Sequence, residues 1–362
     1  MRVSPSTLRS FATGMLDALG APDDTAEKVA DSLCRADMTG YGTHGIAILP
    51  LYHQMIDAGA LDPTAEPTAE LAGSTARVDG HAAFGQLTGH EATATGVALA
   101  EDQGAAVVGI RDGSHLGPVG EFAEAAADAG MVLLAFTNTG GGAKNTAPFG
   151  GHERKLSTNP VAFGFPTFDA LPFDIVADFA TSQVSGSVIR EHHRTGEQLH
   201  DEWTTTESGE PVPGTGAFMN GEGALLPLGG RVTGHKGYAL SVAAELLGGL
   251  VGGEAVVGER DPTWLANGAA FVVVDPTAFV SRATIEQRVE ALASHLRTDE
   301  VRLPGEGTHT RREASRENGV DVATHDLVPL AELASDLAVA VPEEVRDGLR
   351  EADDVDDDVR TW

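Results

Sequence analysis

One histidine, His44, stands in a glycine-punctuated loop between two stretches of helical periodicity. Apolar residues repeat at helical spacing on both sides: Ala26, Val29, Ala30, Leu33 and Ala36 before the loop, and Ile48, Leu49, Tyr52, Met55 and Ile56 after it. An imidazole has a pKa near neutrality, and a loop held between packed helices has a fixed position. His44 is therefore a candidate for proton transfer. The alternative is a loop histidine that lies in water or caps a helix.

Two further segments could bind an anion. The segment Gly113–Pro118 contains His115 and runs from a predicted strand into a predicted helix, whose free N–H groups favour negative charge. The alternative is an ordinary turn with a capping serine. The segment Gly234–Tyr238 places Lys236 between glycines at a predicted helix start, where a cation is disfavoured unless an anion is bound. The alternative is a lysine paired with a surface acid.

Several common signatures are missing. There is no G-x-G-x-x-G dinucleotide fingerprint, no phosphate-binding P-loop and no G-x-S-x-G nucleophile elbow. The three histidines of one polar stretch, His192, His193 and His200, lack a matching set of metal ligands and are interpreted as surface residues, with metal binding as the alternative. The single cysteine, Cys34, excludes an internal disulfide and favours a small core residue.

The chain is strongly acidic, with 54 Asp and Glu against 24 Lys and Arg and a net charge of −30. This disfavours nucleic-acid binding, because no basic patch can neutralise phosphates. With 41% hydrophobic residues the chain is still typical of a folded protein. The acid therefore predicts a solvated shell suited to concentrated salt, as in a halophile. No apolar run could span a bilayer and no basic-then-apolar leader is present, so we expect a cytoplasmic protein without membrane contact.

The pattern along the chain predicts an α/β fold. Strands are expected at 107–110, 132–136, 175–179 and 270–274, and helices at 117–129, 234–250 and 281–296, with Thr181 and Ser182 as helix caps. The stretch 196–230 is interpreted as hairpins or a long loop, and the last 35 or so residues as one or two amphipathic helices with an acidic tail. We expect a helical part at 1–75 that carries His44, an α/β cofactor-binding part at 76–300, and a C-terminal part at 301–362 that packs on the N-terminal part.

Nine short segments, in order between about residues 5 and 335, resemble the malate/L-lactate dehydrogenase family of nicotinamide-dependent 2-oxoacid reductases, which lacks the usual Rossmann fold. The matching segments are Ala36–Tyr52, Ser114–Gly117, Thr137–Asn138, Ala147–Gly151, Ser157–Ala162, Asp178–Ser182, Gly234–Tyr238, Asp275–Phe279 and Leu303–Glu306. Relatives in this family include ureidoglycolate dehydrogenase, diketogulonate reductase, sulfolactate dehydrogenase and reductases of cyclic imine carboxylates.

The resemblance implies roles for particular residues. His44 would be the acid/base at the substrate oxygen, with the hydroxyl of Thr43 beside it and Tyr52 in the substrate pocket. Residues that would line the site for NAD or NADP are His115, Leu116, Gly117, Pro118, Val119, Asp178, Phe179, Ala180, His235, Lys236, Pro304, Gly305 and Glu306. A homodimer is also implied, because active sites of the family form with help from the partner subunit.

The chain departs from the family at several positions. The family usually has serine where Thr43 stands, and arginine where Ile48 stands. That arginine is a natural bidentate partner for a substrate carboxylate. The loop Thr139–Thr146 is longer and richer in glycine than in the family, and its Lys144 either replaces the arginine or is a solvated residue. Ser187 lies near the place where some imine reductases carry an acidic relay residue.

The sequence therefore predicts an NAD(P)-dependent oxidoreductase of a small 2-hydroxy acid/2-oxoacid pair, of malate or lactate type. A cyclic-imine carboxylate reductase on the same fold is the nearest alternative. A non-enzymatic metal- or ligand-binding protein that uses His192, His193 and His200 is a more distant one, and it would leave the ordered segments unexplained. We expect no metal in the active site.

Overall fold

The computed structural model describes residues 1–260, 266–298 and 300–353. The chain divides into two compact units, one made of residues 1–65 together with the chain from Gly305 onward, and the other of Glu66–Pro304. The second unit starts at Glu66, within the segment that the sequence assigned to the N-terminal part. The reason is a strand pairing: β2 (Thr68–Ala72) is hydrogen-bonded to β3 (Thr75–Asp79) and so belongs to the sheet.

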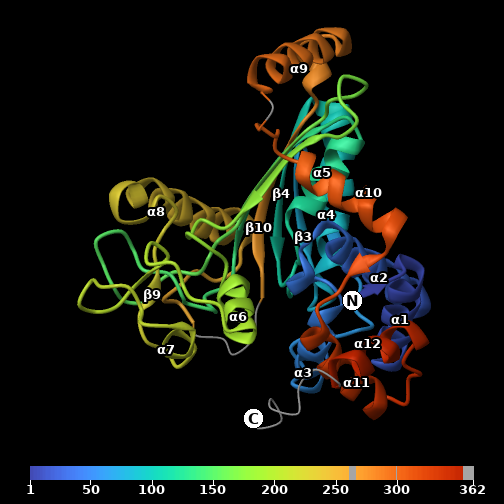
Figure 1. Cartoon of the computed structure of the whole chain (residues 1–362). Helices are drawn as coiled ribbons and strands as arrows, with labels where there is room; N and C mark the ends of the chain where they lie inside the picture. The colour runs from blue at the N-terminus through green and yellow to red at the C-terminus, as the bar shows by residue number, and fades with distance from the viewer. Residues whose placement is uncertain (261–265, 299, 354–362) are drawn as a thin grey trace. The chain divides into compact units, whose positions relative to one another are not determined.

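Unit 1, residues 1–65 and 305 onward, is mostly helical and joins the two ends of the chain (Figure 1). Its helices are α1 (Pro5–Ala18), α2 (Asp23–Thr39), α3 (Leu49–Asp57), α10 (Glu306–Asn318), α11 (Thr324–Asp336) and α12 (Glu343–Asp353). The short strands β1 (Arg2–Val3) and β11 (Val320–Asp321) pair antiparallel. At the start of α1, Glu344 of α12 accepts hydrogen bonds from Ser4 N–H and the Thr7 hydroxyl, which ties the C-terminal helix to the first one.

Local capping sets bounds of the helices in unit 1. Ser4 caps α1 by accepting a hydrogen bond from Thr7 N–H, and α2 ends at Gly40, which adopts the left-handed conformation that favours glycine. The apolar face of α1, formed by Leu8, Phe11, Met15 and Leu16, is buried. Cys34 is also buried, donates to the Pro5 carbonyl, and has its pKa raised to about 12 by burial, so its interpretation as an inert core residue is confirmed.

Unit 2, Glu66–Pro304, is built on a seven-stranded mixed sheet in the order β2-β3-β4-β10-β5-β6-β7. The remaining strands are β4 (Ala105–Arg111), β5 (Val132–Asn138), β6 (Val161–Phe165), β7 (Ile175–Phe179) and β10 (Gly268–Val274). The four strands predicted from the sequence are all present: β4, β5 and β10 are two or three residues longer than predicted, and β7 has the predicted bounds. Strands β3, β4, β5 and β7 run in the same direction, since β10 is antiparallel to both β4 and β5, and β6 to both β5 and β7.

Helices cover both faces of the sheet because side chains alternate along each strand. On β4, Val108 points towards α4 (Gly85–Gln103), and the next residue, Gly109, lies against the backbone of the π-helical turn Gly248–Gly252. The α5 helix (Gly120–Asp128) contacts β5, β6 and β7, and the π-helical turn extends α8 (Gly230–Leu247). The core of unit 2 is the layer between the sheet and the helices α4 and α5, with Val108, Phe122 and Phe271 at its centre.

Several predicted helix bounds in unit 2 need correction. The helix expected from Gly117 begins at Gly120, so Pro118 precedes it. Thr181 and Ser182 do not cap a helix: α6 (Gly186–Thr195) is capped by Ser185. The stretch 196–230 holds α7 (Thr215–Met219) and the paired strands β8 (Thr204–Thr205) and β9 (Ala224–Leu225). The helix α9 (Arg282–Leu296), capped by Ser281, is as expected.

The expected C-terminal helices are α11 and α12, whereas the acidic residues 354–358 lie outside the described residues. None of the helices in the described ranges has the length and apolar character needed to cross a membrane.

Candidate active site

In unit 1, His44 lies at the end of a single 3-10 turn, η1 (Gly42–His44), between α2 and α3. A second 3-10 turn, η2 (Ile46–Ile48), leads directly into α3. The His44 N–H donates to the Tyr41 carbonyl at 2.8 Å, and the Thr43 hydroxyl lies 3.2 Å from His44 Nδ1. Both side chains are partly exposed. The loop therefore presents an oriented imidazole at the surface of unit 1, and the structure brings the two predicted catalytic residues together.

The carboxyl group of Asp37 supports this loop from α2. Its Oδ2 accepts a hydrogen bond from Ile46 N–H at 2.9 Å. A Cβ atom placed on Gly45 would lie 1.8 Å from Asp37 Oδ1, so any side chain at that position would displace the Asp37 carboxyl group. Burial raises the pKa of Asp37 to about 8, against the opposing effect of the Ile46 hydrogen bond. The sequence analysis gave Asp37 no role. Its position in the same matched segment as His44 was the one signal that could have indicated a contact with the loop.

Two other predicted positions of unit 1 differ in exposure. Ile48, which stands in place of the family arginine, is partly exposed at the end of η2. Tyr52 is 1% exposed and packs in the core of unit 1. The substrate contact expected of Tyr52 stays a prediction.

In unit 2, most of the predicted cofactor residues follow strands that end at one edge of the sheet. Strands β4, β5 and β7 end there at Arg111, Asn138 and Phe179. The segment with His115 follows β4, the loop with Lys144 follows β5, and Asp178, Phe179 and Ala180 form the end of β7. In open α/β sheets, ligands bind beyond the carboxyl ends of the strands.

The segment after β4 meets this edge through its backbone. Leu116, Pro118 and Val119 are buried, whereas His115 and Gly117 are partly exposed. Gly117 has φ of +78°, a conformation that favours glycine, and Leu116 N–H donates to Asn267 Oδ1 at 2.9 Å. Because Leu116 and Val119 point into the core, this segment can meet a ligand only through its backbone, His115 and Gly117.

Asp178 lies against the first residue of α5. Its Oδ2 accepts the Gly120 N–H at 2.8 Å, and a Cβ atom on Gly120 would lie only 2.8 Å from the Cβ of Asp178. Burial raises the pKa of Asp178 to about 6, and the hydrogen bond from Gly120 opposes this rise. Oδ1 has no hydrogen-bond partner among the described residues, so this carboxylate keeps one acceptor for a ligand hydroxyl.

The position of Lys236 differs from the prediction. The helix α8 begins at Gly230, so His235 and Lys236 lie in its second turn and not at its free N–H groups. The argument from the helix dipole therefore does not hold for Lys236. The side chain is exposed and forms no ion pair within the described part of the chain, although the protein is strongly acidic. His235 packs edge-on against Phe149, with ring centroids 5.6 Å apart.

Comparison with known proteins identifies the family. A model of the malate/L-lactate dehydrogenase family matches residues 3–330. An L-lactate dehydrogenase of Cupriavidus necator is 34% identical over 94% of this chain and 99% of its own. The chain belongs to the malate/L-lactate dehydrogenase family. This membership makes it an oxidoreductase that uses a nicotinamide cofactor, and the resemblance drawn from the sequence is confirmed.

Solved structures of malate/L-lactate dehydrogenase type confirm the fold. The malate dehydrogenase of Entamoeba histolytica has a TM-score of 0.87 at 26% identity, covering 94% of this chain and 99% of that one. The delta1-piperideine-2-carboxylate reductase of Pseudomonas syringae pvar. tomato has a TM-score of 0.81 at 29% identity, covering 92% of this chain and 100% of that one.

A buried polar network in this member of the malate/L-lactate dehydrogenase family was not predicted. Glu245 of α8 is buried and accepts hydrogen bonds from Val257 N–H at 2.8 Å and Asn159 Nδ2 at 2.8 Å. Asn138, at the end of β5, accepts from Gly140 N–H and Gly268 N–H. The network thus fixes the start of the loop that carries Lys144. Asn138 and Asn159 both donate to the Glu245 carboxylate. Both asparagines lie in the matched segments, but nothing in their spacing indicated that they share this partner.

The remaining expectations concern α6 and the junction of the units. The rings of His192 and His200 both pack against Trp203, and His193 contacts the Thr215 hydroxyl. No group of three potential metal ligands occurs in the residues the structure describes, so the metal-binding alternative has no support there. Ser187 accepts a hydrogen bond from Arg190 at 2.9 Å.

Pro304 ends unit 2, and in unit 1 Gly305 is the N-cap of α10, which begins at Glu306.

Proposed function

We propose that this protein is an NAD(P)-dependent dehydrogenase of a small 2-hydroxy acid, of malate or lactate type, with His44 as its acid/base. The observation that carries the proposal is the Thr43–His44 pair on a short turn that Asp37 supports. The contact with Thr43 uses Nδ1, so the proposal assigns the transferred proton to Nε2. In reduction His44 gives this proton to the carbonyl oxygen of the substrate, and in oxidation it takes the proton back from the hydroxyl.

The residues at the sheet edge of unit 2 fit a dinucleotide. Asp178 keeps one carboxylate oxygen for a ribose hydroxyl, and Lys236 is an exposed cation without an acidic partner in the described ranges, suited to a phosphate. The nicotinamide supplies the hydride carrier when it is bound. The proposal includes NAD and NADP alike, and parallel titrations with the two cofactors separate them.

Substrate recognition needs a cation other than residue 48. Ile48 cannot form the forked, charge-assisted contact of an arginine with a carboxylate. Lys144, which is partly exposed and follows the strand end at Asn138, is the replacement that we propose. Ile48 lies in unit 1 and Lys144 in unit 2, so the substitution would move the cation to another part of the chain.

A cyclic-imine carboxylate reductase is the second candidate. Two observations favour it: the likeness to the delta1-piperideine-2-carboxylate reductase structure, and the absence of the family arginine at Ile48. The deciding experiment measures NADH and NADPH oxidation in concentrated salt with pyruvate, oxaloacetate and piperideine-2-carboxylate. Turnover of an oxoacid supports the dehydrogenase. Turnover of the imine alone replaces it by the reductase, and failure of all substrates with both cofactors contradicts both candidates.

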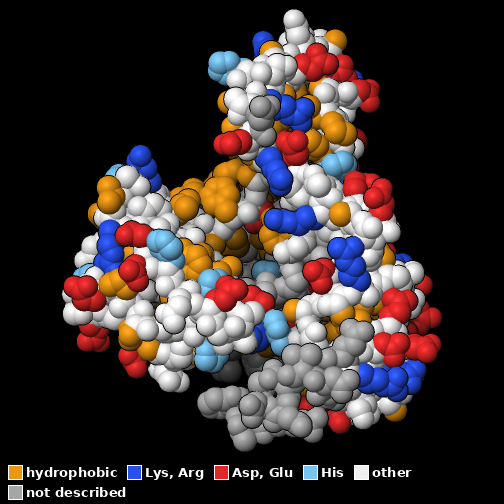
Figure 2. All heavy atoms as spheres, in the orientation of Figure 1, with side chains coloured by type: hydrophobic (Ala, Val, Ile, Leu, Met, Phe, Trp, Pro, Cys, Tyr) orange, Lys and Arg blue, Asp and Glu red, His pale blue; other side chains and the backbone are white. Residues whose placement is uncertain are grey.

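We further propose that the protein is a homodimer. Large apolar side chains are exposed along α8 and the turn that follows it: Val232 is 83%, Leu246 46% and Leu250 81% exposed. Figure 2 shows hydrophobic side chains gathered over α8 and the neighbouring strands. Apolar patches of this kind are unusual on a monomer and typical of a subunit interface. Sedimentation analysis in concentrated salt tests this, and a mass of one chain contradicts it.

A further inference from the structure

The carboxyl group of Asp37 contacts the two residues that follow His44 in its loop. Its Oδ2 holds Ile46 N–H, and its Oδ1 occupies the space that a side chain on Gly45 would need. These two loop residues directly follow His44. Since α2 is packed along α1 and α10, the carboxyl group is a fixed point against which the loop is positioned.

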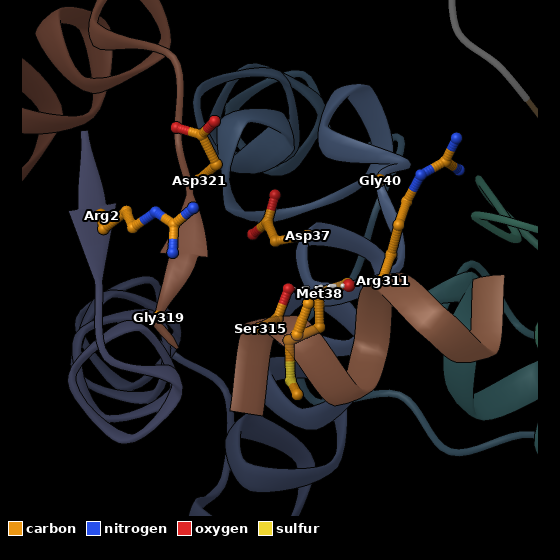
Figure 3. Close-up of a pocket in the computed structure, with 9 residues that line it drawn as sticks. Arg2, Asp37, Met38, Gly40, Arg311, Ser315, Gly319 and Asp321 are labelled. Atoms are coloured by element: carbon orange, nitrogen blue, oxygen red, sulfur yellow. Dashed lines mark hydrogen bonds between the residues drawn. The ribbon is translucent and has the colours of Figure 1, made fainter. Parts of the chain in front are cut away.

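The same carboxyl group faces a pocket on its other side. The pocket has a volume of about 200 Å³ and is enclosed by the end of α2, by α10 and by the strands β1 and β11. Figure 3 shows Asp37 projecting into it from α2, with Arg2 and Asp321 on one side and Ser315 below. A pocket of this size holds several water molecules, so solvent can exchange the proton of a carboxyl group that also touches the loop.

The charged groups around Asp37 do not neutralise it. Arg2 donates to the Asn318 carbonyl, and Arg311 lies over Gly40, where its Cδ and Nη1 would be 3.1 and 3.3 Å from a Cβ atom on that residue (Figure 3). Neither arginine forms an ion pair with Asp37 among the described residues. The other titratable groups that face it are Cys34 on α2, Asp321 on β11 and Asp326 on α11, and His44 is carried by the loop whose Ile46 N–H Asp37 accepts.

Uncompensated burial favours the protonated carboxyl, and Asp326 adds to this, which is why the pKa of Asp37 rises to about 8. Ionisation adds a negative charge that stabilises the imidazolium form of a nearby histidine. The Ile46 hydrogen bond also becomes charge-assisted and stronger.

We propose that Asp37 is the positioning residue of the His44 loop, and that release of its proton through the pocket adjusts both the position and the proton affinity of His44. This inference rests on the proposed function for its catalytic consequence, but not for the geometric coupling. Asp37 acts through the backbone of Gly45 and Ile46 and touches no reacting atom.

The test compares Asp37→Asn, Asp37→Ala and the control Asp24→Asn, all on α2. Asn mimics the protonated carboxyl and cannot ionise, Ala removes the support, and Asp24 is an exposed residue paired with Lys28. The imidazole NMR signal of His44, assigned with His44→Gln, is followed from pH 5 to pH 9 in each protein. We expect a second inflection near pH 8 in the wild type and in Asp24→Asn, and its loss in Asp37→Asn.

Kinetics on the same proteins give the second readout. Asp37→Ala is expected to lower kcat by about 10- to 100-fold, the usual cost of a displaced catalytic group, with an unchanged KM for the cofactor. Asp37→Asn should restore most of kcat at pH 6. The inference is overturned if the inflection persists in Asp37→Asn, or if Asp37→Ala folds by circular dichroism and keeps both kcat and the His44 signal. If His44→Ala is fully active but the inflection follows Asp37, the proposed function fails and the coupling stands.

Discussion

The Thr43 hydroxyl lies 3.2 Å from Nδ1 of His44, on a turn only three residues long. The contact of the Thr43 hydroxyl with Nδ1 helps to orient the imidazole, and the proposed function assigns proton transfer to Nε2. The arrangement is local in sequence, since the two residues are adjacent. The turn holds it only because α2 and α3 are packed on either side.

We expect His44→Ala to lower kcat by about two to four orders of magnitude, the usual scale of general acid–base catalysis. Dinucleotide binding, measured by nicotinamide fluorescence, should be unchanged, because His44 lies in unit 1 and the proposed cofactor residues Asp178 and Lys236 lie in unit 2. His53→Ala is the matched control, since His53 is a histidine of α3 whose partner, Asp57, lies on the surface of the same helix. Near-normal turnover of the His44 variant would remove it from the proposed role.

Lys236→Ala should raise the KM for the cofactor more than the KM for the substrate. An exposed lysine without an ion pair in the described part of the chain is available for a phosphate, and its loss removes a charge-assisted contact. Lys155→Ala is the control, because Lys155 pairs with Glu153 at 2.6 Å. A change confined to substrate affinity would place Lys236 in the substrate pocket instead.

Lys144→Ala should weaken substrate binding by about tenfold or more, which corresponds to ~1.4 kcal/mol. The physical reason is the loss of the cation that we propose for the substrate carboxylate. The double variant Lys144→Ala with Ile48→Arg should recover part of the loss, whereas Lys144→Ala with Ile48→Leu should not. If Lys144→Ala has no effect on any substrate that is turned over, the replacement of the arginine by this lysine is wrong.

The stability of the protein should depend on pH through Asp37. Its pKa is about 8 in the folded protein and about 3.9 in an unfolded chain. Between these values the folded state keeps a proton that the unfolded state has lost, so rising pH lowers the free energy of unfolding. Asp37→Asn lacks this effect. The measured quantity is the free energy of unfolding of Asp37→Asn minus that of the wild type, from urea unfolding at constant salt. This difference should increase from pH 4 to pH 8 and then level off. A difference that does not change with pH would contradict the burial of this carboxyl group.

Removal of salt should unfold the protein. A net charge of −30 produces repulsion between the acidic side chains. Salt weakens this repulsion, because the Debye length falls from about 10 Å at 0.1 M to about 3 Å at 1 M. Circular dichroism and activity are expected to fall on dialysis into dilute buffer and to recover partly when potassium chloride is restored. Unchanged spectra and activity across that range would show that the acidic shell does not require concentrated salt.

The sequence by itself determined the local features of this protein. Helical periodicity located α2 and α3 on either side of His44, and short apolar runs located β4, β5, β7 and β10, because a helix face or a buried strand repeats within a few residues. The order of nine short segments determined the family, which the comparisons confirm. Helix starts were less well predicted. Pro118 precedes α5, and Lys236 lies in the second turn of α8, because capping depends on backbone geometry that neighbouring segments impose.

Only the tertiary structure decided which distant residues meet. The contact of Asp178 with Gly120 joins the end of β7 to the segment that follows β4, because these strands run in the same direction, and the shared contact of Asn138 and Asn159 with Glu245 joins the sheet to α8. The spacing of these residues along the chain carries no record of such contacts. Asp37 is the clearest case: the sequence places it in the His44 loop motif, but its raised pKa arises from burial between α2, the loop and the C-terminal helices, which no local pattern could reveal.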